Sequence, residues 1–386
     1  MGYVALGEVR SEWVAGLRDF LTTDGDEMGD LGGTDGELFF NPLFSGLSGW
    51  TGGENEERVK KERDLSATLQ FVFEEIVMEV IDGLMATDGV GQDVEGLSLG
   101  GGCALNVLAN SEIQRVLKKR GSATHKVHIC AAPGDNGLPV GAAWAVNPPK
   151  RERPQELMFA GFEAWDKADL GDLKALFGGK EGTTVEEVGT LLSKGMIVGV
   201  IRGRQEFGPR ALGHRSLLSI PRADMKDRMN RLKKSEFFRP VAPIVAFEFA
   251  DQVFEDQGVV SPYMSFAPVI RADIADKIPA VVHYDRTARP QTVTQEEEGW
   301  VWRLLWDVAK KSNGVPLVCN MSFNVRGKPI INSFAEGLKL LVEESELDFV
   351  LLEDVLFEKN EVMVKWERVM RAREHLAAEM NAKSSP

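Results

Sequence analysis

The stretch Arg202–Pro240, RGRQEFGPRALGHRSLLSIPRADMKDRMNRLKKSEFFRP, decides how the rest of the chain is interpreted. It holds eleven Lys and Arg against four Asp and Glu, in a chain whose formal net charge is -14. Gly208 and Gly213, with a proline after the first, shape a tight backbone path around Arg210 and Arg215. Arginine forks and nearby backbone N–H groups suit phosphate or carboxylate. The stretch therefore predicts a binding site for a small anion.

Two other interpretations of this stretch stay open. The segment Lys226–Lys234 alternates charge along a helical pattern, which is typical of a solvated helix face. A nucleic-acid surface is a third interpretation, but Phe237 and Phe238 stand at one end of the cations and the whole chain is acidic. A nucleotide or a carbamoyl-type anion fits better than a polymer, so we expect no nucleic-acid partner.

The segments around this stretch predict an α/β domain. Apolar runs followed by polar turns indicate buried strands, and apolar residues at spacings of three and four indicate helices. The predicted strands are residues 196–201, 241–249, 315–323 and 349–357, and the predicted helices are residues 185–194, 334–346 and 362–380. Asn320, Ser322 and Asn324 come at alternate positions, so they face one side together, unless they are turn-forming residues at a strand edge.

The first part of the chain repeats an order of strand, turn and helix. Leu65–Leu84 has helical apolar spacing. The triplet Gly100–Gly102 ends a short strand and precedes a helix, an arrangement that receives phosphates or nucleosides but also permits close strand–helix packing. Asp135 follows the next strand, at the end where α/β sheets bind ligands, although an Asp-Asn-Gly turn forms without any function.

The length of 386 residues is enough for two domains. Three prolines with charged residues between them predict a linker at residues 148–160, which separates domains at residues 1–147 and 161–386. No apolar run approaches the roughly 20 residues that cross a bilayer, so we expect no membrane partner.

The three cysteines, Cys103, Cys130 and Cys319, lack CxxC spacing and lie in or beside apolar runs. This placement argues for buried thiols and against a disulfide framework or a zinc site. The sequence therefore predicts a reducing, cytoplasmic location.

Several motifs, in one order, resemble the ATP-dependent O-carbamoyltransferases, which act on nodulation factors and on antibiotics such as tobramycin, novobiocin and cephamycins. The blocks similar to that family's C-terminal domain are EFGPRALGHRSLLSIPRADMKDRMN with FFRPVAP, YDRTARPQTV and NMSFNVRGKPI. LGGGCALNVLAN and APGDNGLPVGAA resemble its nucleotide-binding and metal-binding turns. The resemblance covers roughly residues 60–360. It implies a partial actin/Hsp70-like (Kae1-like) domain followed by a YrdC/Sua5-like α/β domain.

The resemblance also implies a two-stage reaction. The C-terminal domain would cleave carbamoyl phosphate and adenylate the carbamate with ATP and Mg²⁺, and fixed cations would meet the developing phosphate charge. The N-terminal domain would then transfer the carbamoyl group to a hydroxyl of a small-molecule acceptor beside a divalent transition metal, Fe²⁺ or similar. The expected site residues are Arg210, Arg215, Lys226, Arg239 and Arg289 for the anion, Ser322 and Asn324 for polar contacts, Gly101, Gly102 and Asn106 for the nucleotide, and Asp135 for the metal.

The sequence departs from the family in its metal ligands. The family has an early histidine and an HxxxH pair, which are missing from this chain's five histidines, His125, His128, His214, His283 and His375. The opening MGYVALGE resembles a segment well inside the family's N-terminal domain. We therefore expect a complete adenylation half and an incomplete transfer half. The upstream part is either cut off by a truncated gene model, supplied by a partner chain or lost, and a homodimer is a further alternative.

Two alternatives remain at this point. One is a threonylcarbamoyl-adenylate-type synthase, which uses the same chemistry with threonine and bicarbonate. The other is an inactive nucleotide-binding partner subunit, for which a large apolar surface around Phe39–Trp50 would speak.

Overall fold

The computed structural model describes residues 3–22, 56–87, 96–121, 126–150, 157–325 and 327–369. The segment Phe39–Trp50 lies outside these residues, as do parts of the predicted linker and of the predicted C-terminal helix. The chain divides into two compact units, and each is described by itself. Unit 1 comprises Met1–Leu99, Asn106–His128 and His283–Arg286, and unit 2 comprises Gly100–Leu105, Ile129–Val282 and Thr287–Pro386. The domain boundaries expected around residues 148–160 remain predictions.

Unit 1 is built around one long helix, α3 (Glu56–Met85). The helix predicted at Leu65–Leu84 is confirmed within it, and its apolar residues pack with Leu17 of α1 (Ser11–Thr22). Val80 and Leu84, in the last turns, are exposed instead. The remaining elements of this part of the chain are η1 (Val4–Leu6), α4 (Val107–Lys119), β1 (Leu97–Leu99) and β2 (Val127–Ile129), the last two forming a two-stranded sheet.

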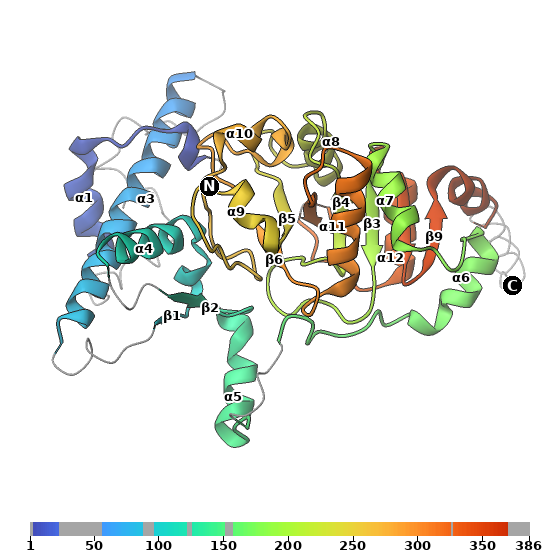
Figure 1. The fold of residues 1–386 in the computed structure, drawn as a ribbon, viewed down its shortest axis with the longest axis horizontal. Helices are drawn as coiled ribbons and strands as arrows, with labels where there is room; N and C mark the ends of the chain where they lie inside the picture. The colour runs from blue at the N-terminus through green and yellow to red at the C-terminus, as the bar shows by residue number, and fades with distance from the viewer. Residues whose placement is uncertain are drawn as a thin grey trace, which may run out of the picture. The chain divides into compact units, whose positions relative to one another are not determined.

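Unit 2 contains a mixed seven-stranded sheet in the order β6-β5-β7-β4-β3-β8-β9 (Figure 1). Parallel pairs join β3 to β8 and β5 to β6, and the other neighbours are antiparallel. The strands are β3 (Val198–Ile201), β4 (Arg215–Ser219), β5 (Ala242–Ala246), β6 (Gln291–Val293), β7 (Leu317–Ser322), β8 (Phe349–Leu352) and β9 (Val355–Glu358).

Both faces of this sheet are buried, because alternate residues of each strand point to opposite sides. On one face, Val200 of β3 and Val318 of β7 pack with α7 (Val185–Ser193) and α11 (Gly299–Lys311). On the other face lie α8 (Met225–Lys233) and α12 (Phe334–Glu343), with further short elements. These are α6 (Leu170–Phe177), α9 (Ala250–Val253), α10 (Ala272–Ala275) and η7 (Pro279–Val281). Phe249 of η6 (Phe247–Phe249) packs against the cores of both faces, and η5 (Lys167–Asp169) directly precedes α6.

The single strand predicted at residues 349–357 is wrong. It forms a hairpin instead, in which Leu352 of β8 pairs with Val355 of β9. Glu353 begins the two-residue turn with a φ of 53°, which a continuous strand does not contain. The acidic pair Glu353 and Asp354 was the turn signal within that apolar run.

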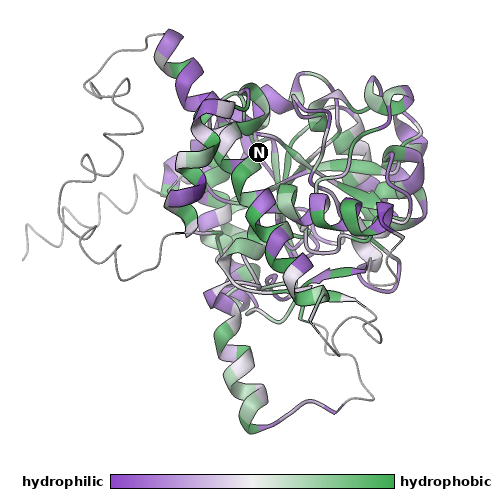
Figure 2. Cartoon of the chain, turned by 90° about the vertical axis from the view of Figure 1, so that its left-hand side faces the viewer, coloured by the Kyte–Doolittle hydropathy of each residue, from purple (hydrophilic) through white to green (hydrophobic). Residues whose placement is uncertain are grey.

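Helix α5 (Leu138–Val146) follows η4 (Asp135–Gly137) in unit 2 and has no buried residue. Leu138 and Val146 are 67% and 88% exposed, although the helix is mostly apolar (Figure 2). Such an exposed apolar helix is unusual in a lone soluble domain. Across the described ranges, no helix is both long and apolar enough to cross a membrane.

Candidate functional site

One end of the unit 2 sheet collects the cationic loops. The register pairs Ser322, at the end of β7, with Ser216 near the start of β4, and pairs Asn320 with Ala242 at the start of β5. β6 runs parallel to β5 and begins at Gln291, two residues after Arg289. The loops that precede β4, β5 and β6 therefore meet the loop that follows β7. These loops carry Arg210, Arg239, Arg289 and Asn324.

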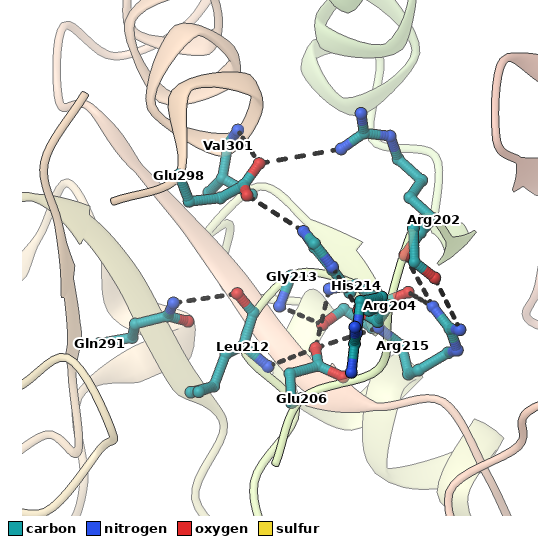
Figure 3. Close-up of polar contacts among 12 residues, drawn as sticks. Arg202, Arg204, Glu206, Leu212, Gly213, His214, Arg215, Gln291, Glu298 and Val301 are labelled. Carbon is teal, nitrogen blue, oxygen red and sulfur yellow. Dashed lines mark hydrogen bonds and ion pairs between the residues drawn. The ribbon is translucent and has the colours of Figure 1, made fainter. Parts of the chain in front are cut away.

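The loop before β4 is held by a buried carboxylate (Figure 3). Glu206 Oε1 accepts hydrogen bonds from the backbone N–H groups of Leu212 at 2.7 Å, His214 at 2.7 Å and Arg215 at 3.0 Å. Gly213 has a φ of 115°, and a Cβ there would lie 2.7 Å from a methyl group of Val301. The glycine and the carboxylate together fix the path of the loop that carries Arg210.

His214 ties the same loop to the start of α11. Its Nδ1 lies 2.6 Å from the carbonyl oxygen of Arg204, and its Nε2 lies 3.0 Å from Glu298. Its ring stacks on Phe159 at 3.7 Å. The pKa of Glu298 is lowered: burial alone would raise it, but the hydrogen bond from His214 and the charges of His214 and Arg202 outweigh that effect. The loop is thus preorganised before any ligand binds.

Arg210 and Arg289 form an uncompensated cationic pair. Both side chains are partly buried, and within the described residues no carboxylate or hydrogen-bond acceptor pairs with either. Burial lowers the pKa of Arg210, and burial together with the charge of Arg210 lowers the pKa of Arg289 to about 9. A buried charge without a partner costs several kcal/mol. An anion between the two guanidinium groups would offset that cost.

Lys233 is a third cation without a carboxylate partner among the described residues, and sequence reasoning missed it. It is 7% exposed, and its Nζ donates to Ser322 O at 2.7 Å, Ser322 Oγ at 3.0 Å and Asn324 Oδ1. Burial first, and the charge of Arg239 second, lower its pKa to about 7. Lys233 follows Met225 and Met229 at intervals of four, so its place on the buried face of α8 was readable from the sequence.

The structure thus brings Ser322 and Asn324 together around Lys233. Asn320 and Ser322 lie two residues apart on β7, about 7 Å along the strand. The Asn320 side chain binds the carbonyl of Ala211, the residue after Arg210, at 2.8 Å. The Lys233 cluster and the Arg210 loop are therefore neighbours at the sheet end.

Arg215 is engaged entirely by the protein. It is 0% exposed, and its guanidinium donates to Asn332 Oδ1 at 3.0 and 2.9 Å and to backbone carbonyls at residues 162, 202, 203 and 214. These bonds use all five of its N–H groups. The geometry favours a role in fixing the loop over a direct contact with an anion.

The other predicted cations differ in their surroundings. Arg239 forms an ion pair with Glu236 at 2.6 Å, and its side chain is 53% exposed. Its positive charge also helps to lower the pKa of Lys233. Lys226 lies two helical turns before Lys233 on the same side of α8, and burial lowers its pKa. Elsewhere in the stretch, Arg202, Arg222, Arg228, Arg231 and Lys234 each have a carboxylate partner. Arg210, Arg289 and Lys233 differ from these paired cations.

The two glycine loops lie side by side in unit 2. The Gly101 N–H donates to Pro133 O at 2.7 Å, and a Cβ on Gly134 would lie 3.9 Å from the Gly102 Cα. Gly101 has a φ of 84° with open space around it. Asn106 is placed in unit 1, where its side chain caps α4 and exchanges hydrogen bonds with Gln70. Its amide is thus occupied by the protein.

Asp135 begins η4 and is exposed. In the part of the chain that the structure describes, no group of three or more His, Cys, Asp or Glu side chains could hold a metal ion. A transition-metal site normally needs three or more protein ligands. The described residues therefore do not fit the metal that the resemblance implies.

An open pocket of about 610 Å³ lies close to the Arg210 loop. It is lined by Gly161, Phe162, Glu163, Trp165 and Arg204. The Gly161 N–H donates to Gln205 O at 3.0 Å, and Arg204 Nε donates to Gly161 O at 2.9 Å, so the pocket wall is continuous with the loop. Phe162 and Trp165, which line this pocket, are 83% and 76% exposed.

The fold is that of an α/β protein, and its mixed sheet gathers cations without carboxylate partners among the described residues at one end. The family model described as Carbamoyltransferase C-terminus matches residues 189–359, which include the whole cationic site, and the one described as Carbamoyltransferase N-terminus matches residues 1–144.

Curated relatives agree with the family models. A nodulation protein NolNO of Sinorhizobium fredii is 33% identical over 314 residues, 78% of this chain and 45% of the relative. A nodulation protein U of Rhizobium tropici is 35% identical over 270 residues, 69% of this chain and 44% of the relative. An uncharacterized protein of Methanocaldococcus jannaschii is 29% identical over 310 residues, 76% of this chain and 56% of the relative.

The chain belongs to the carbamoyltransferase family, a family of transferases. It spans about half the length of the curated relatives that it matches.

Proposed function

We propose that this chain forms carbamoyl-adenylate from carbamoyl phosphate and ATP. The observation that carries the proposal is the pair Arg210 and Arg289, two partly buried guanidinium groups without an anionic partner among the described residues. Lys233, Ser322 and Asn324 add polar groups at the same sheet end. Substrates with several negative charges suit such a site.

The proposed reaction breaks and forms bonds in two steps. Water first cleaves carbamoyl phosphate, which gives carbamate, inorganic phosphate and a proton released to solvent. A carbamate oxygen then attacks the α-phosphorus of ATP, the bond to the β-phosphate oxygen breaks, and pyrophosphate leaves. Arg210 and Arg289 hold the phosphate charge, and Lys233 meets charge that develops beside Ser322. Mg²⁺ accompanies ATP as part of that substrate, and the pocket beside Phe162 and Trp165 accommodates the adenosine.

We further propose that the carbamoyl group passes to a hydroxyl of a small molecule in the complete enzyme. The acceptor hydroxyl attacks the carbonyl carbon and AMP leaves. Unit 2 would have the YrdC/Sua5-like fold, and residues of the N-terminal match would belong to an actin-like domain. Helix α5 is apolar and exposed, which supports the proposal that a further segment or a partner chain covers it in the complete enzyme. The prediction of buried thiols holds for Cys319 alone, because Cys103 is exposed and Cys130 is partly exposed. The absence of a disulfide among these three cysteines supports a cytoplasmic location.

Pyrophosphate release from ATP by the purified chain tests this proposal. We expect release that depends on carbamoyl phosphate and that threonine with bicarbonate does not support. Release with threonine and bicarbonate alone would favour a threonylcarbamoyl-adenylate-type synthase. Absence of release with either substrate set, in a folded chain that binds ATP, would favour the inactive nucleotide-binding partner subunit.

A further inference from the structure

Besides Glu206 Oε2 within the Arg210 loop itself, three buried polar atoms beneath this loop have no hydrogen-bond partner among the described residues. They are Arg289 Nε, Gln291 Oε1 and Asn320 Oδ1. Gln291 is 0% exposed and Asn320 is 2% exposed. A buried polar atom without a partner costs about 1–3 kcal/mol, and native proteins contain few of them. One unpaired donor and two unpaired acceptors in neighbouring residues point to a ligand.

The two amide side chains lie on one face of the sheet and under one turn. Gln291 alternates with Val293 on β6, Asn320 alternates with Val318 on β7, and both valines belong to the core beneath α11. Gln291 Nε2 donates to Leu212 O at 2.9 Å (Figure 3). Asn320 Nδ2 donates to Ala211 O at 2.8 Å. Because these carbonyls are consecutive, both amide groups lie directly below the turn that carries Arg210.

The arrangement specifies the chemistry of its ligand. The guanidinium groups of Arg210 and Arg289 require an anion, and the amide oxygens of Gln291 and Asn320 require N–H donors. A carbamoyl phosphate carries both features, because its amino group offers two N–H donors next to a phosphate. Acetyl phosphate has the same shape and charge but presents a methyl group, which would leave both amide oxygens unpaired.

We propose that Gln291 and Asn320 accept the two N–H groups of the carbamoyl amino group and so select carbamoyl phosphate over other acyl phosphates. This inference rests on the proposed function and adds the residues that decide its substrate. The amide nitrogens hold the Arg210 loop, and the amide oxygens recognise the substrate. A site that accepts a hydrogen bond from a substrate N–H group binds an analogue without that group far more weakly.

Binding of carbamoyl phosphate, acetyl phosphate and inorganic phosphate to the purified chain, measured by calorimetry, tests the proposal. The wild-type chain should bind carbamoyl phosphate at least about 100-fold more tightly than acetyl phosphate. Asn320→Leu and Gln291→Met should each reduce that ratio to about tenfold or less. Because both substitutions also remove a hydrogen bond to the Arg210 loop, any loss of affinity for inorganic phosphate should appear equally for acetyl phosphate, and carbamoyl phosphate should lose more than either. Asn313→Ala, in a partly buried amide before the opposite end of β7, should leave the ratio unchanged.

Each outcome decides one claim. A wild-type chain that binds both acyl phosphates equally overturns the selectivity and leaves the proposed function intact, and this comparison needs no variant. Variants that keep the wild-type ratio overturn the roles of Gln291 and Asn320. A uniform loss for all three ligands would show that the amides act by holding the loop alone. A wild-type chain that binds inorganic phosphate but not carbamoyl phosphate would overturn the proposed function as well.

Discussion

The sheet end and the glycine loops of unit 2 were predicted with similar motifs but differ in structure. At the sheet end, Arg210, Arg289 and Lys233 are buried to a degree that makes an unpaired charge costly. In the glycine loops, Gly101 and Asp135 are exposed, and among the described residues of these loops no charged side chain is buried. In the first region, a bound anion would offset the free-energy cost of the buried charges. In the second region, no such cost needs to be offset. This contrast supports the proposal that the adenylation site is complete in the described residues and the transfer site is not.

The same contrast separates cations within the sheet end. Arg215 satisfies its whole guanidinium with carbonyl and amide oxygens, and Arg210, five residues earlier, pairs with no described residue. Two arginines of one motif therefore have different tasks. Arg215 stabilises the loop, and Arg210 is the one that we propose binds the substrate.

The largest expected effect is the loss of catalytic rate caused by the substitution Arg210→Ala. Removing one fixed cation from the developing phosphate charge should lower the rate of pyrophosphate release by about 100-fold or more. The melting temperature should stay the same or rise, because the repulsion from Arg289 disappears. Arg271→Ala, which removes an exposed arginine paired with Asp273, is the matched control and should keep full activity. An active Arg210→Ala variant would exclude Arg210 from the site.

The next effect is on stability, from Arg215→Ala. Loss of this buried side chain leaves several carbonyl oxygens and Asn332 unpaired, so the free energy of unfolding should fall by about 3 kcal/mol or more. Urea denaturation monitored by tryptophan fluorescence measures this change. If Arg215→Ala proved as stable as wild type but inactive, the division of tasks between Arg210 and Arg215 would be wrong.

A smaller effect concerns the pH dependence of stability. The pKa of Lys233 in the folded chain is about 7, below its ordinary value of 10.5. Charging this buried amine therefore opposes folding fully below pH 7, and the penalty fades as pH rises towards 10.5. Between about pH 6.5 and about pH 9, wild type should gain about 2 kcal/mol of stability relative to Lys233→Met. Urea denaturation at each pH measures the free energy of unfolding of both proteins. If that free energy changes with pH by the same amount in wild type and in Lys233→Met, the lowered pKa of Lys233 is wrong.

The smallest expected effect is that of Asp135→Asn. Asp135 is exposed, and the described residues around it provide no set of metal ligands. The rate of carbamoyl-phosphate-dependent pyrophosphate release should therefore stay within about twofold of wild type. A large loss in this partial reaction would join the glycine loops to the adenylation site and remove the contrast between the two regions.

Sequence patterns predicted β3, β5, β7, α7 and α12 of unit 2, because apolar periodicity reports burial directly. They missed β4 and joined β8 and β9 into one strand. They also identified Ser322 and Asn324 as neighbours from their alternate spacing. They did not separate Arg210 from Arg215, because the partners of Arg215 come from residues as distant as Asn332. The task of Lys233 was hidden by its charged neighbours, although its four-residue spacing from Met229 indicated the buried face. Whether a cation has a hydrogen-bond or carboxylate partner depends on residues far away in the sequence. A single sequence does not show which of those residues lie near it.

Exchange of labelled pyrophosphate into ATP, with carbamoyl phosphate present and no acceptor, tests the central claim most directly. The account predicts exchange that requires carbamoyl phosphate and that Arg210→Ala and Arg289→Ala both abolish, because adenylation is reversible at a complete site. A folded wild-type chain that catalyses no exchange, or exchange that survives in both variants, would contradict it.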